Sequence, residues 1–88
     1  MRYNITERTI DIQASTTIMP EERYGGWFAS NQGNVDVTVM GYTIAPGKGL
    51  DMRDAVPAGS VWGSPIQIVV PAGGVVRLTR LQYNEIKK

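Results

Sequence analysis

The side chains available for acid–base chemistry in this chain are carboxylates, lysines and tyrosines, because the sequence contains no cysteine and no histidine. A Ser-His-Asp or Cys-His arrangement is therefore impossible within one chain, and zinc lacks its two best ligands. The acids cluster at Glu21 with Glu22 and at Asp51 with Asp54. Loop carboxylates can hold Ca²⁺, but this spacing matches no calcium-binding loop. We predict surface charges here, and a protein that is not an enzyme, with no catalytic residue, metal ligand or cofactor site.

A lysine between glycines, Gly47-Lys48-Gly49, invites comparison with a phosphate-binding loop. That motif needs a longer glycine-bounded loop, a Lys followed by Ser or Thr, and then a helix. Here Lys48 is followed by Gly49 and Leu50, and no segment of the chain has a helical period. The segment is therefore interpreted as a turn.

Aromatic side chains are the remaining candidates for a functional surface. Five of them are considered: Trp27, Trp62, Tyr24, Tyr42 and Tyr83. Trp27 and Tyr42 fall on the inward face of the strands predicted below, so we expect them in the core. Tyr24 precedes Gly25-Gly26 and Trp62 precedes Gly63. These two are the better candidates for an exposed platform that stacks on a sugar or contacts another protein.

The elements that must position these residues are β-strands, because Val, Ile, Thr and Tyr dominate and Gly, Pro and Asn interrupt them at short intervals. A single helical turn is considered at 20–23. The strands are expected near 2–6, 9–13, 27–30, 35–39, 42–45, 49–52, 60–62, 66–70 and 75–83. This pattern predicts an all-β fold, a small antiparallel β-sandwich or jelly-roll-like barrel whose short strands are joined by tight Pro/Gly turns.

The length of each turn follows from keeping apolar residues on one face, since a one-residue slip reverses every side chain. Loop 71–73, with Gly73 in the left-handed conformation, places Ile68 opposite Val76. A two-residue turn at Met40-Gly41 places Val39 opposite Tyr42 and Val37 opposite Ile44.

Three other turns follow the same reasoning. Loop 31–33 would place Gly33 in the left-handed position and Trp27 opposite Val37, with loop 31–34 as an alternative. Loop 46–48 preserves the apolar face but puts Lys48 in that position, and a type II turn with Gly47 third competes. The Val56–Ser60 turn would place Ala55 opposite Val61.

The chain is expected to be one domain, with an N-terminal strand or arm at 1–20 and a β-sandwich core at 21–88. Residues 1–20 alternate like a strand without an evident hairpin partner, so they could add a strand to a neighbouring molecule. In the last strand, Arg77 and Leu81 share a face with Val69 and Val75. Apolar residues on both faces of this strand suggest that a partner chain covers one, so Arg77 and Leu81 are interface candidates.

Net charge excludes some partners. The sequence has nine basic and eight acidic residues, which gives a formal net charge of +1. No nucleic-acid partner is therefore expected. No apolar stretch is long enough for a membrane span or a secretory signal, so no membrane is expected either.

Two blocks of the sequence resemble small structural proteins of tailed bacteriophages. The first, "SNQGNVDVTVMGYTIAPGKGLDM", has an Asn, a Gly, alternating valines, a Gly turn and then Pro-Gly. Those positions are Asn31, Gly33, Val35, Val37, Val39, Gly41, Ile44, Pro46 and Gly47. The second, "VWGSPIQIVVPAGGVVRLTRLQYNE", has a Trp-x-x-Pro-Ile lead-in to a final hairpin. Together they span Ser30 to Glu85.

The resemblance implies a non-enzymatic virion component, assembled in the host cytoplasm. We expect a capsid decoration (cement) protein that stabilises the shell and binds a major capsid or tail protein. A homo-oligomer, with a trimer favoured, is expected. Two alternatives stay open: a carbohydrate- or surface-binding module of a fibre or tail, and a neck or tail accessory protein.

Overall fold

The chain forms eight antiparallel β-strands in the computed structural model, which describes residues 3–57 and 60–85. The strands are β1 (Tyr3–Ile12), β2 (Thr16–Ile18), β3 (Tyr24–Asn31), β4 (Val37–Val39), β5 (Tyr42–Ile44), β6 (Gly49–Asp51), β7 (Ile66–Val69) and β8 (Val76–Glu85). The strands coincide with the Val-, Ile- and Tyr-rich stretches, whose side chains fit a pleated and half-buried surface. The all-β prediction is confirmed.

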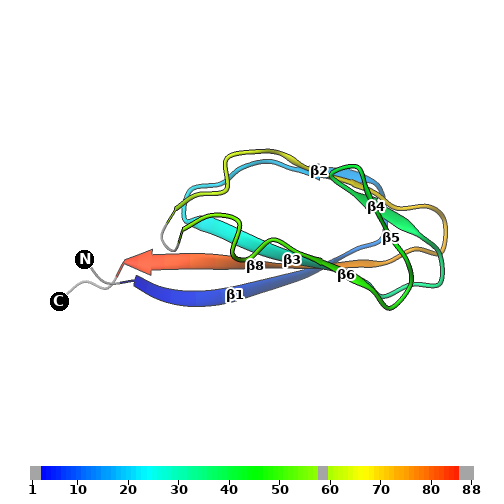
Figure 1. Ribbon diagram of the computed structural model, residues 1–88, viewed down its shortest axis with the longest axis horizontal. Helices are drawn as coiled ribbons and strands as arrows, with labels where there is room; N and C mark the ends of the chain where they lie inside the picture. The colour runs from blue at the N-terminus through cyan, green and yellow to red at the C-terminus, as the bar shows by residue number, and fades with distance from the viewer. Residues whose placement is uncertain (1–2, 58–59, 86–88) are drawn as a thin grey trace.

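The strands form two four-stranded sheets, with the orders β1-β8-β3-β6 and β2-β7-β4-β5. Figure 1 shows the two layers, with the long β1 and β8 side by side in one and β2, β4 and β5 in the other. This order is that of a nested hairpin. β4 pairs with β5 at the centre, β3 pairs with β6 around it, and β7 and β8 pair with β2 and β1. Rolled up into two sheets, such a hairpin is a jelly roll, which is a form of β-sandwich.

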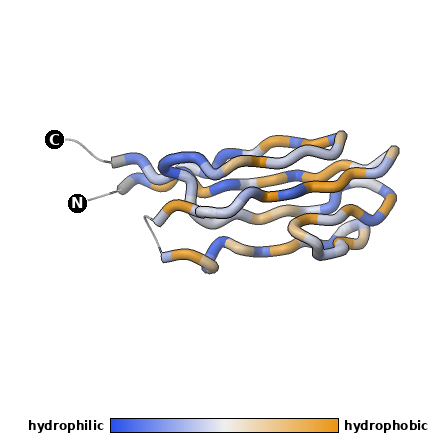
Figure 2. The backbone as a smooth tube through the Cα atoms, turned by 90° about the horizontal axis from the view of Figure 1, so that it is seen from above, coloured by the Kyte–Doolittle hydropathy of each residue, from blue (hydrophilic) through white to orange (hydrophobic). Residues whose placement is uncertain are grey.

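The core lies between the sheets and contains one inward-facing set of apolar side chains from each. Its buried members are Ile12, Trp27, Ala29, Val37, Val39, Ile44, Ile66, Ile68, Val70, Val76 and Leu78. Hydrophobic and hydrophilic residues alternate along the strands (Figure 2), as period-two side-chain geometry requires. The core prediction holds for Trp27, which is fully buried. It is wrong for Tyr42, which is 58% exposed because β5 is a sheet edge.

The Met40-Gly41 turn has the predicted register. Val39 pairs with Tyr42 and Val37 with Ile44. Both turn residues have positive φ, 50° and 82°, as in a hairpin turn whose twist matches its strands. This is the centre of the nested hairpin.

The hairpins predicted at 31–33, 46–48 and 71–73 are wrong as strand pairs. Each of these turns carries the chain from one sheet to the other. The predicted turn residue is correct at Gly73 (φ 84°), and at 46–48 the type II alternative is correct, with Gly47 at φ 78°. Gly33 has no positive φ. A Cβ there would instead lie 2.7 Å from the backbone nitrogen of Val75.

Several element boundaries also differ from the prediction. Residues 3–12 form one strand instead of two, 16–18 form the unpredicted β2, and 60–62 form no strand. The 56–60 hairpin includes 58–59, which lie outside the described residues. At 20–23 the chain makes a turn in which the Tyr24 N–H donates to the Glu21 carbonyl at 3.3 Å. Arg23, with φ 76°, is left-handed and therefore not helical.

The N-terminal segment is part of the sandwich. β1 pairs with β8 through ten consecutive residue pairs, and β2 pairs with β7. The hairpin partner that the sequence does not reveal for this segment is therefore at the far end of the chain.

Candidate binding site

An irregularity in β3 brings two aromatic side chains to the same face. Tyr24 pairs with Gln82 and Trp27 pairs with Arg80, so β3 has one residue more than β8 between the two pairs. Residues three apart in a regular strand point to opposite faces, but an extra residue restores them to one face. Gly25 and Gly26 form this bulge, and both are buried. A Cβ on Gly25 would lie 2.8 Å from the Ser60 carbonyl oxygen, so the chains approach too closely for a side chain.

Trp27 and Trp62 pack edge to face, with ring centroids 5.4 Å apart and an interplanar angle of 86°. Trp27 is fully buried and Trp62 is half-buried. The Nε1 atoms of both rings are buried, and no acceptor among the described residues bonds to either. An unsatisfied buried donor costs about 1–3 kcal/mol. These two indole N–H groups therefore lower the stability of the folded protein.

Arg80 lies between the Tyr24 ring and an acid. Its guanidinium carbon lies 4.0 Å from the centroid of the Tyr24 ring, and its Nη1 lies 3.1 Å from Glu21 Oε1. The Arg80 side chain is only 14% exposed, whereas that of Glu21 is 54% exposed. A cation held over an aromatic face and paired with a carboxylate is fixed in position.

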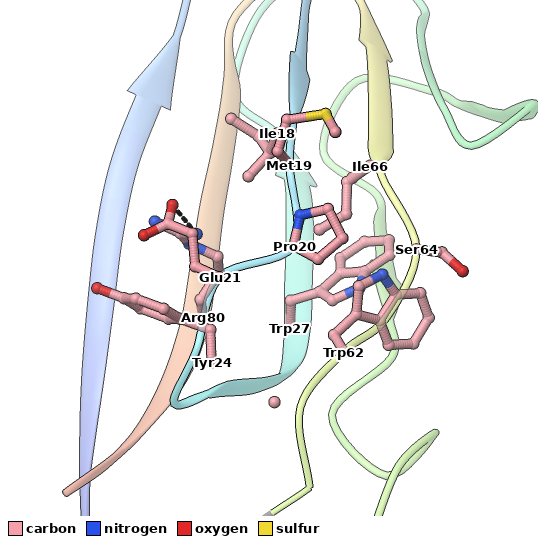
Figure 3. Close-up of a pocket in the computed structure, with 11 residues that line it drawn as sticks. Ile18, Met19, Pro20, Glu21, Tyr24, Trp27, Trp62, Ser64, Ile66 and Arg80 are labelled. Atoms are coloured by element: carbon pink, nitrogen blue, oxygen red, sulfur yellow. Dashed lines mark hydrogen bonds and ion pairs between the residues drawn. The ribbon is translucent and has the colours of Figure 1, made fainter.

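These residues line one pocket at the end of the sandwich. It is a partly open hollow of about 230 Å³ when the solvent space at its mouth is included, and its walls are mostly apolar. Figure 3 shows Pro20 above the two indole rings, with Tyr24, Arg80 and Glu21 on one side and Ser64 on the other. The structure thus brings together Tyr24 and Trp62, two of the four predicted site residues.

Arg77 and Leu81 lie elsewhere, on the outer face of the sheet β1-β8-β3-β6. Side chains alternate along β8, so Arg77 and Leu81 point away from the core that contains Val76 and Leu78. Arg77 Nε donates to Asp11 Oδ1 at 2.9 Å on the neighbouring strand. Val69, expected on the same face, belongs instead to β7 in the other sheet.

Three carboxylates of the described residues are paired with arginines: Asp51 with Arg53, Asp11 with Arg77 and Glu21 with Arg80. Arg53 lowers the pKa of Asp51 to about 2, mainly through side-chain hydrogen bonds, the shorter of 2.6 Å. A side-chain hydrogen bond from Arg77 likewise lowers the pKa of Asp11. Within 3–57 and 60–85, no three acidic residues gather as metal ligands would.

Comparison with known proteins gives no match to a family model, a curated protein or a solved structure. No helix in the described part of the chain is long and apolar enough to span a membrane.

Sequence reasoning missed Arg80 and Glu21 as partners of the aromatic residues, and it assigned Trp27 to the core alone. The available signal was Gly25-Gly26 inside a strand-forming stretch, since glycine in a strand often marks a bulge or a close approach. No spacing rule connects Trp62 to this site, because it lies in an irregular segment between β6 and β7.

Proposed function

We propose that this chain is a non-enzymatic structural protein that binds neighbouring subunits through the free edge of β1. The biological setting proposed is a tailed-bacteriophage virion, with the chain as a trimeric capsid decoration protein. Its partner would be the major capsid or tail protein, met in the host cytoplasm during assembly.

The observation that carries the proposal is the length and composition of β1. It is ten residues long and is the first strand of its sheet, so one side pairs with β8 and the other pairs with no described strand. Ile5 is 55% exposed and Ile10 is 42% exposed, and β1 contains no proline. The side chains of β1 are mixed, with Glu7, Arg8 and Asp11 beside the isoleucines, but the unpaired backbone N–H and C=O groups of an edge strand are a template for pairing with another chain. A strand added here would satisfy the backbone groups and cover both isoleucines.

Two further arguments support the virion setting. Jelly-roll sandwiches recur in viral capsid and lectin domains, although a fold by itself does not define a function. The blocks at 30–52 and 61–85 resemble small phage structural proteins. A neck or tail accessory protein would use the same edge on a different lattice.

The carbohydrate-platform alternative has less support. Stacking on a sugar needs an open aromatic face. The guanidinium of Arg80 covers one face of Tyr24, and Trp62 packs against Trp27.

Substitutions on β1 test this proposal better than deletion, because removing β1 would also uncover β8. The test variant is Ile5→Lys with Ile10→Lys, which places a charge on each face of the edge. The matched control is Val69→Lys, whose parent side chain is 43% exposed on the other sheet. Native mass spectrometry and co-sedimentation with purified tailed-phage capsids are the measurements.

The unmodified protein and the control should form trimers and sediment with capsids, and the double variant should do neither. A double variant that assembles and binds as well as the control would refute the role of β1. A protein that stays monomeric at high concentration and sediments with no capsid would refute the decoration function itself.

A further inference from the structure

The pocket at Trp27 and Trp62 differs from the rest of the interior in its hydrogen bonding. Asn31, also buried, has its amide group engaged through both nitrogen and oxygen. The indole N–H groups of Trp27 and Trp62 are the buried side-chain polar atoms without a partner in the described part of the chain. In the view of Figure 3 both ring nitrogens are drawn toward the place where the two rings meet, and the ring centroids are 5.4 Å apart. One acceptor atom placed there could receive both donors.

The charges of the pocket favour a neutral acceptor. Its one basic side chain, Arg80, is already paired with Glu21 at 3.1 Å and lies over the Tyr24 ring. An anionic ligand would therefore lose its hydration without gaining a free cation. Neutral indole donors, by contrast, are suited to a carbonyl oxygen.

The walls favour a compact apolar body around that oxygen. Ile18, Met19, Pro20 and Ile66 line the pocket with the two tryptophans. Met19, at 61% exposure, is a large hydrophobic side chain at the rim. The space is small, Arg80 covers one face of Tyr24 and the two indole rings pack edge to face, which disfavours a sugar ring.

We propose that the Trp27–Trp62 pocket binds a neutral carbonyl or amide group carried on a compact apolar body, as in a side chain or main chain of a peptide partner. This site is separate from the β1 edge and does not depend on it. Both nitrogens are closed to solvent, so entry requires a shift of Trp62. That residue lies in a segment without strand structure, and its backbone N–H donates to the Tyr24 carbonyl at 2.9 Å.

The two tryptophans are the only ones in the sequence, so an ¹H–¹⁵N spectrum gives one indole signal for each donor. The probe is cyclopentanone, and its matched control is methylenecyclopentane, which has the same shape without the acceptor. Cyclopentanone should move both indole proton signals downfield and saturate, while methylenecyclopentane should not move them downfield. Acetate and methyl glucoside, tested in parallel, should bind more weakly.

The variant Trp62→Phe keeps an aromatic ring but removes one donor. It should weaken cyclopentanone binding about three- to tenfold, the loss expected for one neutral hydrogen bond. Tyr42→Phe, which removes a hydroxyl from the exposed β5 edge, should leave the affinity unchanged. Equal binding by Trp62→Phe would refute the two-donor site.

Three other results would also overturn the proposal. If no compound gives a saturable shift, the pocket is not a binding site for a carbonyl group. Tighter binding of acetate would make this an anion site, and tighter binding of methyl glucoside would make it a sugar site.

Discussion

The side-chain nitrogen of Asn31 donates a hydrogen bond to the carbonyl oxygen of Ile44 at 2.9 Å, and this bond connects β3 in one sheet with β5 in the other. The same nitrogen donates to the Val35 carbonyl at 2.7 Å, and the side-chain oxygen accepts the Gly33 N–H at 3.0 Å. Asn31 is 1% exposed. One buried amide therefore connects two of the chain segments that cross between the sheets at this end of the sandwich, the one that follows β3 and the one that follows β5.

Replacing Asn31 should be among the most damaging polar substitutions in the chain. Asn31→Ala removes three hydrogen bonds and leaves buried backbone groups unpaired, so the free energy of unfolding should fall by about 2–4 kcal/mol. Urea denaturation followed by fluorescence measures this. The control is Gln32→Ala, because Gln32 is exposed and, among the described residues, its side chain bonds only to the hydroxyl of Ser30. Equal stability of the two variants would contradict the role given to Asn31.

Alanine substitutions at Gly41 and Gly63 can be compared to measure backbone strain without steric crowding. A Cβ at either position would meet no atom within 4 Å, but only Gly41 has a positive φ, of 82°. Gly41→Ala should therefore destabilise the protein by about 1–2 kcal/mol, the cost of a left-handed residue with a Cβ. Gly63→Ala should be nearly neutral. Thermal unfolding of both variants measures the difference, and the same loss in each would show that φ is not the cause.

Gly25→Ala should disrupt the bulge that positions Tyr24 and Trp27. Its Cβ would collide with the Tyr83 ring and would lie 2.8 Å from the Ser60 carbonyl oxygen. We expect a loss of about 2 kcal/mol or more, as for other overpacked sites. The near-ultraviolet circular dichroism of the Trp27–Trp62 pair should change as well. Gly63→Ala again provides the control, and an unaltered Gly25→Ala spectrum would argue against the bulge.

Arg53→Met should raise the pKa of Asp51 part of the way to its ordinary value, because the side-chain hydrogen bonds are lost while the backbone N–H of residue 53 still donates to Oδ1 at 3.0 Å. In the folded protein Arg53 holds the pKa of this carboxyl at about 2, below the reference value of 3.8. The pair therefore stabilises the fold fully above about pH 4, and this contribution is lost as the pH falls through about 2. Carboxyl ¹³C titration should show the Asp51 midpoint rising in the variant. Asp11, whose pKa is lowered by Arg77, should not change. An unmoved Asp51 midpoint would contradict the assignment.

The sequence was sufficient for the fold class and for the inward faces of the strands, but not for the choice of strand partners. Ile68 and Val76 were predicted to face each other across a hairpin, yet β7 and β8 belong to opposite sheets, and both residues are buried between them. Apolar residues meet in the same core whether their strands are neighbours or lie across a sandwich. The alternation that reveals a face therefore carries no information about which strand is adjacent.

The candidate site was partly predictable for a related reason. Tyr24 and Trp62 were selected because glycines flank them, and they do line one pocket. Arg80 and Trp27 join them only through the extra residue at Gly25-Gly26. A sequence period counts residues along one strand, so it cannot show where two strands lose their register.

The nested pairing of the strands also suggests an order of folding. The turn at Met40-Gly41 closes the shortest loop in the fold, between β4 and β5. The ladder between β1 and β8 joins residues at nearly opposite ends of the described chain. Closing that loop directly would cost the most chain entropy, but each ladder formed outward from Met40-Gly41 shortens the loop that the next must close. Zipping from the centre outward would make the β1 edge, on which the proposed assembly depends, the last surface to be completed.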